Sequence, residues 1–410
     1  MAHVHSHGSA GPAAPRTTFL LVITLVSALL LTLAGLWLLW PNAGDVPDRV
    51  PAKAEGTSFV DVTVTGPADP ATGSIPVELP SGEASRMQSP GPSVPLADGD
   101  RITAVDISQV SQAGVDPLVF MDYQRELPIA LLAAVFAVVV LLVARWRGLA
   151  AMAGLGMAFV VLLGFTMPAL LAGESAIGVA LVTSSLVMFV TLYLAHGLSA
   201  RTSTALLGTL VGLGLTALLA AWASGAAQIT GTTDEASAFL PSSAPGADLR
   251  GIALCGIVLA GMGVLNDVTI TQASAVWELR GVAPGASRAE LFTRAMRIGR
   301  DHIASTVYTI AFAYVGASLP LLMMVWLVDQ SPATALSSGE IAEEVVRTLV
   351  GSIGLVLAIP VTTAIATLTV PGPADPAGGP AAYEPASDPE LMAPVSEAWA
   401  ARPASEASAT

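Results

Sequence analysis

Long apolar runs dominate the chain, and short polar segments separate them. Eight of these runs reach the length of about 20 residues that an α-helix needs to cross the hydrocarbon core of a bilayer. The predicted spans are Thr18–Trp40, Leu127–Ala144, Leu149–Ala172, Ser175–Ala195, Thr202–Ser224, Ile252–Gln272, Ile303–Leu327 and Val345–Val370. The pattern predicts an all-α polytopic membrane protein with about 8 transmembrane helices. The first span is too long for a signal-peptide core, and we expect it to be retained as an anchor.

The polar segment between the first two spans, residues 41–126, alternates apolar and polar residues at a period of two. Phe59–Val64 and Arg101–Ile107 show this pattern clearly, and Ile75–Leu79 and Leu118–Tyr123 are shorter runs of the same kind. The segment predicts a small extracytoplasmic β domain, a barrel or a sandwich, between helices 1 and 2. An oligomer-binding barrel fits the size. A spacer domain without a ligand is the alternative.

Arginine placement orients the spans, because cytoplasmic loops of membrane proteins are enriched in Lys and Arg. With the N-terminus inside, most of the arginines near span ends fall on the cytoplasmic side, and only Arg250 and Arg347 fall outside. The arginines on the cytoplasmic side are Arg16, Arg145, Arg147, Arg201, Arg280, Arg288, Arg294, Arg297 and Arg300. We therefore expect a multi-pass protein of the cell (plasma) membrane with both termini in the cytoplasm.

Five segments follow from these patterns. Residues 1–17 are predicted to be a disordered cytoplasmic N-terminus, 18–40 the anchor helix and 41–126 the extracytoplasmic β-rich domain. Residues 127–370 form a seven-helix membrane core, and 371–410 a disordered, acidic cytoplasmic tail.

Composition supports a membrane protein and excludes several other classes. The chain is 53% hydrophobic and 12% charged, and its formal charge of −14 lies largely outside the spans. Its one cysteine, Cys255, falls inside an apolar run, so no disulfide framework is expected. The sequence contains no P-loop, no zinc-protease motif and no nucleophile elbow. We expect no enzymatic activity, no cofactor and no nucleic-acid partner.

The sharpest candidate for function is Asp267, because an ionisable residue within a span is costly unless it is paired or solvated. Orientation places it in the inner half of its span, near other polar residues that the sequence puts on the cytoplasmic side. Together the candidates are Asn266, Asp267, Thr269, Thr271, Gln272, Arg300, Asp301, His302, His196, Thr362 and Thr363. We expect Asp267 and Thr271 to share a helix face with the small residues Gly256, Ala260 and Gly263, which would allow close packing.

Two interpretations of this cluster remain open. It suits a cation site or a proton relay, with His302 able to change charge near neutral pH. Alternatively, Asp267 pairs with Arg300, His302 or Arg297 and serves only to clamp two helices together.

The inner loop before the seventh predicted span contains a basic amphipathic helix, residues 287–300. Ser287 and Glu290 have the spacing of a capping box at its start. Its arginines suit contact with anionic lipid of the bilayer, and the alternatives are a plain topology signal or docking of a cytoplasmic partner. These arginines are Arg288, Arg294, Arg297 and Arg300. At the N-terminus, His3, His5 and His7 are a weak candidate for metal binding.

Several long strings of residues in this chain resemble the YibE/F-like family of multi-pass membrane proteins, in its actinobacterial form. The strings are DYQRELP at 122–128, AHGLSARTS at 195–203, GVLNDVTITQASAVWEL at 263–279, IGRDHIAS at 298–305 and EEVVRTLVGSIG at 343–354. The resemblance covers about residues 18–370. The resemblance implies membership of the family and its membrane topology. Members of the family are uncharacterised or are presumed permeases, so the resemblance implies no mechanism. The family pattern leads us to expect two aspartates where this chain has Asn266 and Asp267, which weakens a two-carboxylate mechanism here.

Two functions from different classes are consistent with these features. The first is a secondary transporter or permease that moves a small solute or cation through a polar site near the cytoplasmic leaflet. The alternative is a non-transporting envelope scaffold or assembly protein that acts through its external β domain and its basic cytoplasmic loop.

Overall fold

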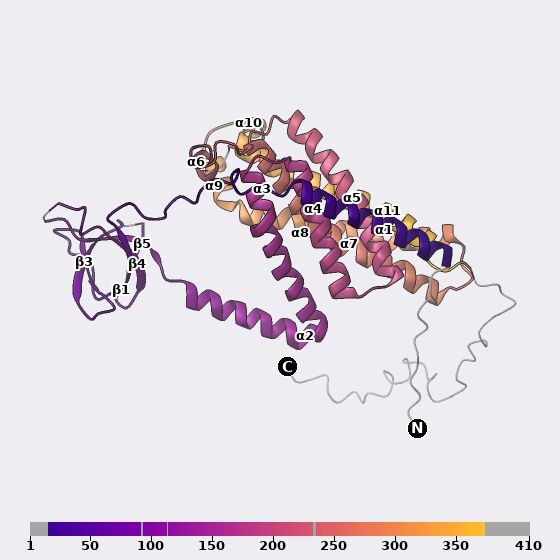
Figure 1. The fold of residues 1–410 in the computed structure, drawn as a ribbon, viewed down its shortest axis with the longest axis horizontal. Coiled ribbons are helices and arrows are strands. Elements are labelled where there is room, and N and C mark those ends of the chain that lie inside the picture. The colour runs from indigo at the N-terminus through magenta and orange to yellow at the C-terminus, as the bar shows by residue number, and fades with distance from the viewer. Residues whose placement is uncertain (1–14, 92, 113, 233–234, 374–410) are drawn as a thin grey trace, which may run out of the picture.

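A computed structural model of the chain describes residues 15–91, 93–112, 114–232 and 235–373. It consists of a helix bundle and a small β-barrel (Figure 1). The barrel lies beyond one end of the bundle, whereas the start of α1 (Pro15–Leu38) and the end of α11 (Gly339–Thr369) lie at the other end. The predicted helical protein with a β domain after its first helix is confirmed in this form. Two predicted features lie outside the described residues: the histidines His3, His5 and His7, and nearly all of the acidic tail.

Five strands form the β domain, each near a period-two segment or a turn-rich segment of the sequence. They are β1 (Ser58–Val64), β2 (Ser74–Glu78), β3 (Ala84–Gln88), β4 (Arg101–Asp106) and β5 (Leu118–Tyr123). The strands close in the order β1-β2-β3-β5-β4, with β3 and β5 parallel and the other pairs antiparallel. This is a small barrel rather than a sandwich. A five-stranded Greek-key barrel is the architecture of oligomer-binding domains.

The alternation along the strands fills the barrel interior. On β1, Val62 and Val64 are buried while Asp61 and Thr63 between and beside them face outward. Ile102, Met87 and Ala104 have no exposed surface at all. The other residues of this core are Ile75, Val77 and Leu118. β3 was not predicted, because Ala84–Gln88 carries only one large apolar residue.

Six helical segments among the described residues are long and apolar enough to cross a membrane. They are α1, the kinked segment Glu126–Leu171, α4 (Ala176–His196), α5 (Ala200–Ala226), α7 (Leu249–Val282) and α11. A seventh candidate is the bent pair of α8 (Arg288–Ala317) and α9 (Leu319–Leu327). The predicted spans 18–40, 175–195, 202–224, 252–272 and 345–370 therefore correspond to helices, most of them longer than predicted. The count of about eight is not reached by this criterion.

The second and third predicted spans are the two halves of one helical segment that is kinked at Arg145. It comprises α2 (Glu126–Val161), the π-helical turn η1 (Leu162–Thr166) and α3 (Met167–Leu171). The predicted stop at residues 145–147 is a kink, because Arg145 has φ 54° and ψ −131° while the helix resumes directly after it. Pro168 follows the π-helical turn, where a missing N–H interrupts the α-helical hydrogen bonds.

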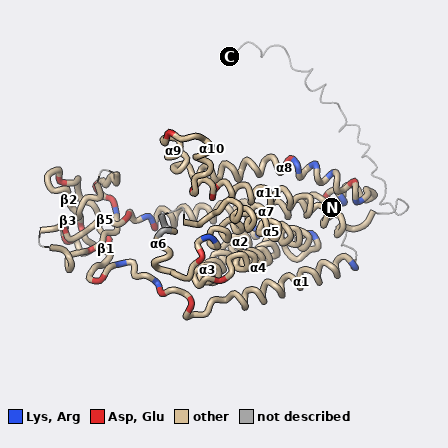
Figure 2. Tube along the Cα trace, turned by 90° about the horizontal axis from the view of Figure 1, so that it is seen from above, with Lys and Arg blue, Asp and Glu red and all other residues tan. Residues whose placement is uncertain are grey.

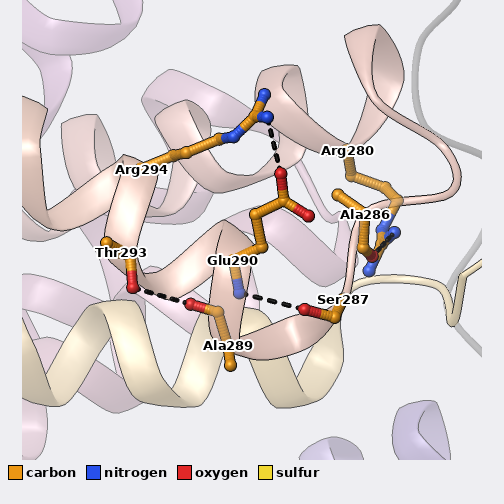
Figure 3. Close-up of polar contacts among 7 residues, drawn as sticks. All are labelled: Arg280, Ala286, Ser287, Ala289, Glu290, Thr293 and Arg294. Carbon is orange, nitrogen blue, oxygen red and sulfur yellow. Dashed lines mark hydrogen bonds and ion pairs between the residues drawn. The ribbon is translucent and has the colours of Figure 1, made fainter.

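The amphipathic helix and the seventh predicted span are also continuous. α8 runs from Arg288 to Ala317, through the amphipathic helix and the first part of the predicted span, and the chain then bends by 69° into α9, which forms the rest of that span. The break lies where Pro320 follows Ser318, since proline cannot donate the next helical hydrogen bond. Ser287 caps α8 by accepting a hydrogen bond from the Glu290 N–H at 3.2 Å, as the capping-box spacing predicts (Figure 3).

The centre of the bundle is the contact of α5, α7 and α11, and small residues let these helices approach closely. The Cα of Gly208 on α5 lies against the Thr362 side chain, and Gly354 on α11 lies against Thr216. Gly261 on α7 faces Thr216 as well. Two short helices, α6 (Glu235–Ser243) and α10 (Pro332–Leu336), complete the loops. Figure 2 shows acidic residues around the barrel and basic residues along α8, away from the barrel.

Candidate functional site

Asp267 lies near the middle of α7, because this helix continues ten residues beyond the predicted span end at Gln272. Its side chain is 71% exposed, so it sits on the surface of the helix bundle rather than in an enclosed cavity. A carboxylate in this position within a membrane span requires a polar partner or water.

His302 of α8 supplies that partner. Its Nε2 atom lies 3.8 Å from Oδ2 of Asp267, and its side chain is 30% exposed. This Nε2 atom is buried and has no hydrogen-bond partner in the described structure. The distance exceeds that of a hydrogen bond. The two groups are therefore positioned to attract each other when the imidazole is protonated, while leaving room for a small displacement.

A second polar contact joins the same two helices about two turns earlier on α8. Gln272 is 2% exposed, and its side-chain amide donates to the Ala295 carbonyl at 2.9 Å. Gly299 makes this approach possible, since a Cβ there would lie 3.1 Å from the Gln272 Oε1 atom and 2.7 Å from Ile359. α7 and α8 are thus held by one buried, neutral contact and one exposed, titratable contact.

The remaining predicted residues do not join this pair. Thr271, Arg300 and Asp301 are exposed, and none of them forms an ion pair with Asp267 among the described residues. His196 is exposed at the end of α4, and its carbonyl accepts a 3.5 Å hydrogen bond from Thr202. The predicted pairing of Asp267 with Arg300 or Arg297 is therefore not seen, and the pairing with His302 is.

The predicted threonines belong to the bundle interior. Thr269 bonds to Thr209 of α5 at 2.6 Å, and Thr363 donates to the Ile359 carbonyl at 2.7 Å. Thr362 is fully buried, and its hydroxyl has no partner in the described structure. Thr269 and Asp267 face different sides of α7, because positions two apart on a helix differ by about 200°. The predicted residues therefore do not form a single polar cluster. The threonines lie in the interior of the helix bundle, and the Asp267–His302 pair lies at its surface.

The packing of the small residues on α7 also differs from the prediction. A Cβ at Gly256 or Gly263 would meet nothing within 4 Å, so these residues do not mediate close packing in this structure. The face that carries Asp267 is open. Asn266, next to Asp267, keeps its Oδ1 atom buried and without a hydrogen-bond partner in the described structure.

A cluster of charged side chains on α11 was not predicted from the sequence. Arg347 bonds to Glu343 and to Glu344, each at 3.0 Å, and Glu343 is 8% exposed. Spacings of three and four residues on one helix are the signal that could have found it. A crevice of about 280 Å³ between α8, α9 and α11 runs beside Glu344 and Tyr314, next to the break at Ser318.

Among the residues that the structure describes, no three His, Cys, Asp or Glu side chains are grouped so that they could hold a metal ion. Cys255 is free and buried, as expected of a core residue.

No curated protein and no solved structure matches the chain. The family model described as YibE/F-like protein matches residues 132–372, more than half of the chain, including the α7 and α8 strings that carry Asp267 and His302. The chain therefore belongs to the YibE/F-like protein family.

Proposed function

We propose that this YibE/F-like protein is a secondary transporter of the cell membrane, in which proton or cation binding at Asp267 and His302 is coupled to movement of α8 against α7. The observation that carries the proposal is the 3.8 Å approach of these two side chains across the α7–α8 contact. Ionisable residues within membrane spans mark ion pathways and proton relays.

The coupling follows from charge. Histidine is the side chain whose charge ordinarily changes near neutral pH. A protonated His302 attracts the Asp267 carboxylate and draws α8 toward α7, whereas a neutral His302 or a cation bound at Asp267 removes that attraction. The Gln272–Ala295 contact persists in both states, so it can serve as the fixed point of the motion.

The shapes of the helices support transport rather than a static role. α8 and α9 form a broken helix with a 69° bend, and a π-helical turn interrupts the segment after α2. Discontinuous helices form the substrate and ion sites of many secondary transporters. π-Helical turns are also frequent at functional sites.

We further infer that the chain crosses the membrane eight times with both termini in the cytoplasm. The 46-residue segment Glu126–Leu171 would be roughly 70 Å long if straight, over twice the hydrocarbon thickness. Its two halves diverge from Arg145 as a V, and the start of α1 lies at the same end of the bundle as the end of α11 (Figure 1). A chain whose two ends lie on the same side of a membrane crosses that membrane an even number of times.

A flux screen in proteoliposomes tests the proposal. Wild-type protein should move at least one member of a panel of protons, metal cations and organic anions, and Asp267→Ala should abolish that flux. Asp301→Ala is the matched control, since Asp301 is an exposed acid next to His302. Folded Asp267→Ala protein with wild-type flux would refute the site, and no flux for any solute would refute transport of these classes.

The second candidate is a non-transporting envelope scaffold, which the closed barrel favours. The barrel has its own buried core and lies beyond the bundle, where a partner could reach it (Figure 1). Crosslinking in intact cells should then recover a stable partner through the barrel, and a protein that transports without such a partner would count against this function.

A further inference from the structure

Arg280, near the end of α7, is the one arginine that is buried among the described residues, with 3% of its surface exposed. Its Nη1 atom donates to the Pro284 carbonyl at 2.9 Å. The same atom donates to the Ala286 carbonyl at 2.7 Å (Figure 3). These bonds hold the turn between α7 and α8. They use only one side of the guanidinium group.

The other side of the guanidinium has no acceptor. The Nε and Nη2 atoms of Arg280 are both buried and lack a hydrogen-bond partner in the described structure. Their N–H groups form one planar fork, which matches the two oxygens of a carboxylate or a phosphate. Arg288 lies close enough to add repulsion between positive charges. A buried cationic fork without an acceptor is costly, so this position calls for an oxyanion.

The chain's own carboxyl-terminal segment begins beside this turn. Val370, at the end of α11, is buried in the same apolar cluster as Trp277 and Ala286. Beyond it, residues 371–410 carry six acidic residues and one arginine. The first of these acids, Asp375, follows Val370 by five residues, a reach of at most about 18 Å. Charge and connectivity both favour this segment as the source of the oxyanion.

We propose that the free edge of Arg280 binds the carboxylate of Asp375, the first acid of the carboxyl-terminal segment. The contact joins the end of α11 to the α7–α8 turn, from which α8 carries His302. It therefore restrains the helix that the proposed function requires to move. The proposed contact does not depend on transport, so a failure of the transport proposal would leave it unaffected.

Hydrogen–deuterium exchange of the full chain in phosphatidylcholine nanodiscs tests this contact. We expect amides of residues 374–384 to exchange about tenfold faster in Asp375→Asn and in Arg280→Gln than in wild type. Arg294→Gln is the matched arginine control, because Arg294 pairs with Glu290 on the exposed face of α8. Glu384→Gln is the control for the acidic segment. Both controls should exchange like wild type.

Asp375→Asn keeps both bonds from Arg280 to the turn, so it separates the contact from damage to the fold. The double variant should exchange no faster than either single variant. Wild-type exchange in Asp375→Asn would overturn the proposal, as would an increase confined to Arg280→Gln. Fast wild-type exchange of residues 374–384, with slower exchange of residues 280–286 only when phosphatidylglycerol or inorganic phosphate is added, would assign the fork to phosphate and also overturn the proposal.

Discussion

Asp267 and His302 face each other across the contact of α7 and α8, with 3.8 Å between the carboxylate Oδ2 and the imidazole Nε2. The pair lies on the open side of α7, and the buried Gln272–Ala295 hydrogen bond fixes the same two helices nearby. One contact therefore joins two titratable side chains, and the other joins two neutral groups. This combination is what a coupled movement of α8 requires.

Gly299 should be essential for the approach of α8. A Cβ in Gly299→Ala would lie 2.7 Å from Ile359 Cγ2, and such overpacking costs about 1–3 kcal/mol. We expect a lower thermal unfolding midpoint in detergent. Gly316→Ala on the same helix is the control, since nothing lies within 4 Å of its added Cβ, and it should be neutral or slightly stabilising. Equal midpoints for the two variants would contradict the packing.

Gly208 should be equally sensitive at the centre of the bundle. Its added Cβ would overlap the Thr362 hydroxyl, so Gly208→Ala should destabilise the protein by about 1–3 kcal/mol. Thr362→Ala in the same chain should recover part of the loss, because it removes the overlapping group. Gly214→Ala, with open space around it, serves as the reference. An absence of rescue in the double variant would show that another contact causes the loss.

Arg347 should contribute more than an exposed arginine. Arg347→Gln removes the guanidinium that bonds to both Glu343 and Glu344, and we expect a loss of about 1–3 kcal/mol because these groups are partly buried. Arg294→Gln breaks an exposed pair and should cost at most about 1 kcal/mol. Chemical unfolding of both variants, monitored by tryptophan fluorescence, makes the comparison. A smaller effect at Arg347 than at Arg294 would be inconsistent with the burial.

Next to the β domain, a hydrogen bond from Arg125, at 2.7 Å, lowers the pKa of Asp122 below its ordinary value. A lowered carboxyl pKa adds stability at pH above the unfolded-state value, and this stability is lost as the pH falls through the folded-state pKa. Arg125→Gln should therefore raise the pKa of Asp122 toward that of a free aspartate. Carbon-13 titration of labelled aspartate carboxyls in the full chain measures it, and an unchanged Asp122 value would show that Arg125 is not the cause.

Hydropathy and periodicity predicted most of the helices and four of the five strands, because each signal is local. Apolar runs located the helices, and the alternation in Phe59–Val64 located β1 of the barrel. The breaks could not be placed in the same way. Arg145 interrupts an apolar run as a loop would, yet the backbone turns sharply at that one residue and remains helical on both sides.

The site was predicted only in part for a similar reason. The cost of a carboxylate in a span identifies Asp267 from sequence alone, but its partner depends on how α7 and α8 are rotated. Arg300 and His302 are two positions apart on α8 and so face different sides, and only His302 reaches Asp267. The free edge of Arg280 depends on which carbonyls the neighbouring turn presents, and no sequence pattern reveals that.

The most direct test of the central claim is a double-mutant cycle on coupled flux in proteoliposomes, using Asp267→Asn and His302→Gln. If the two residues act as one coupling unit, each single variant should lose most of the flux and the double variant should lose no more than either. Asp301→Asn should retain wild-type flux. Independent, multiplicative losses, or wild-type flux in either single variant, would contradict the claim that this pair couples ion binding to the movement of α8.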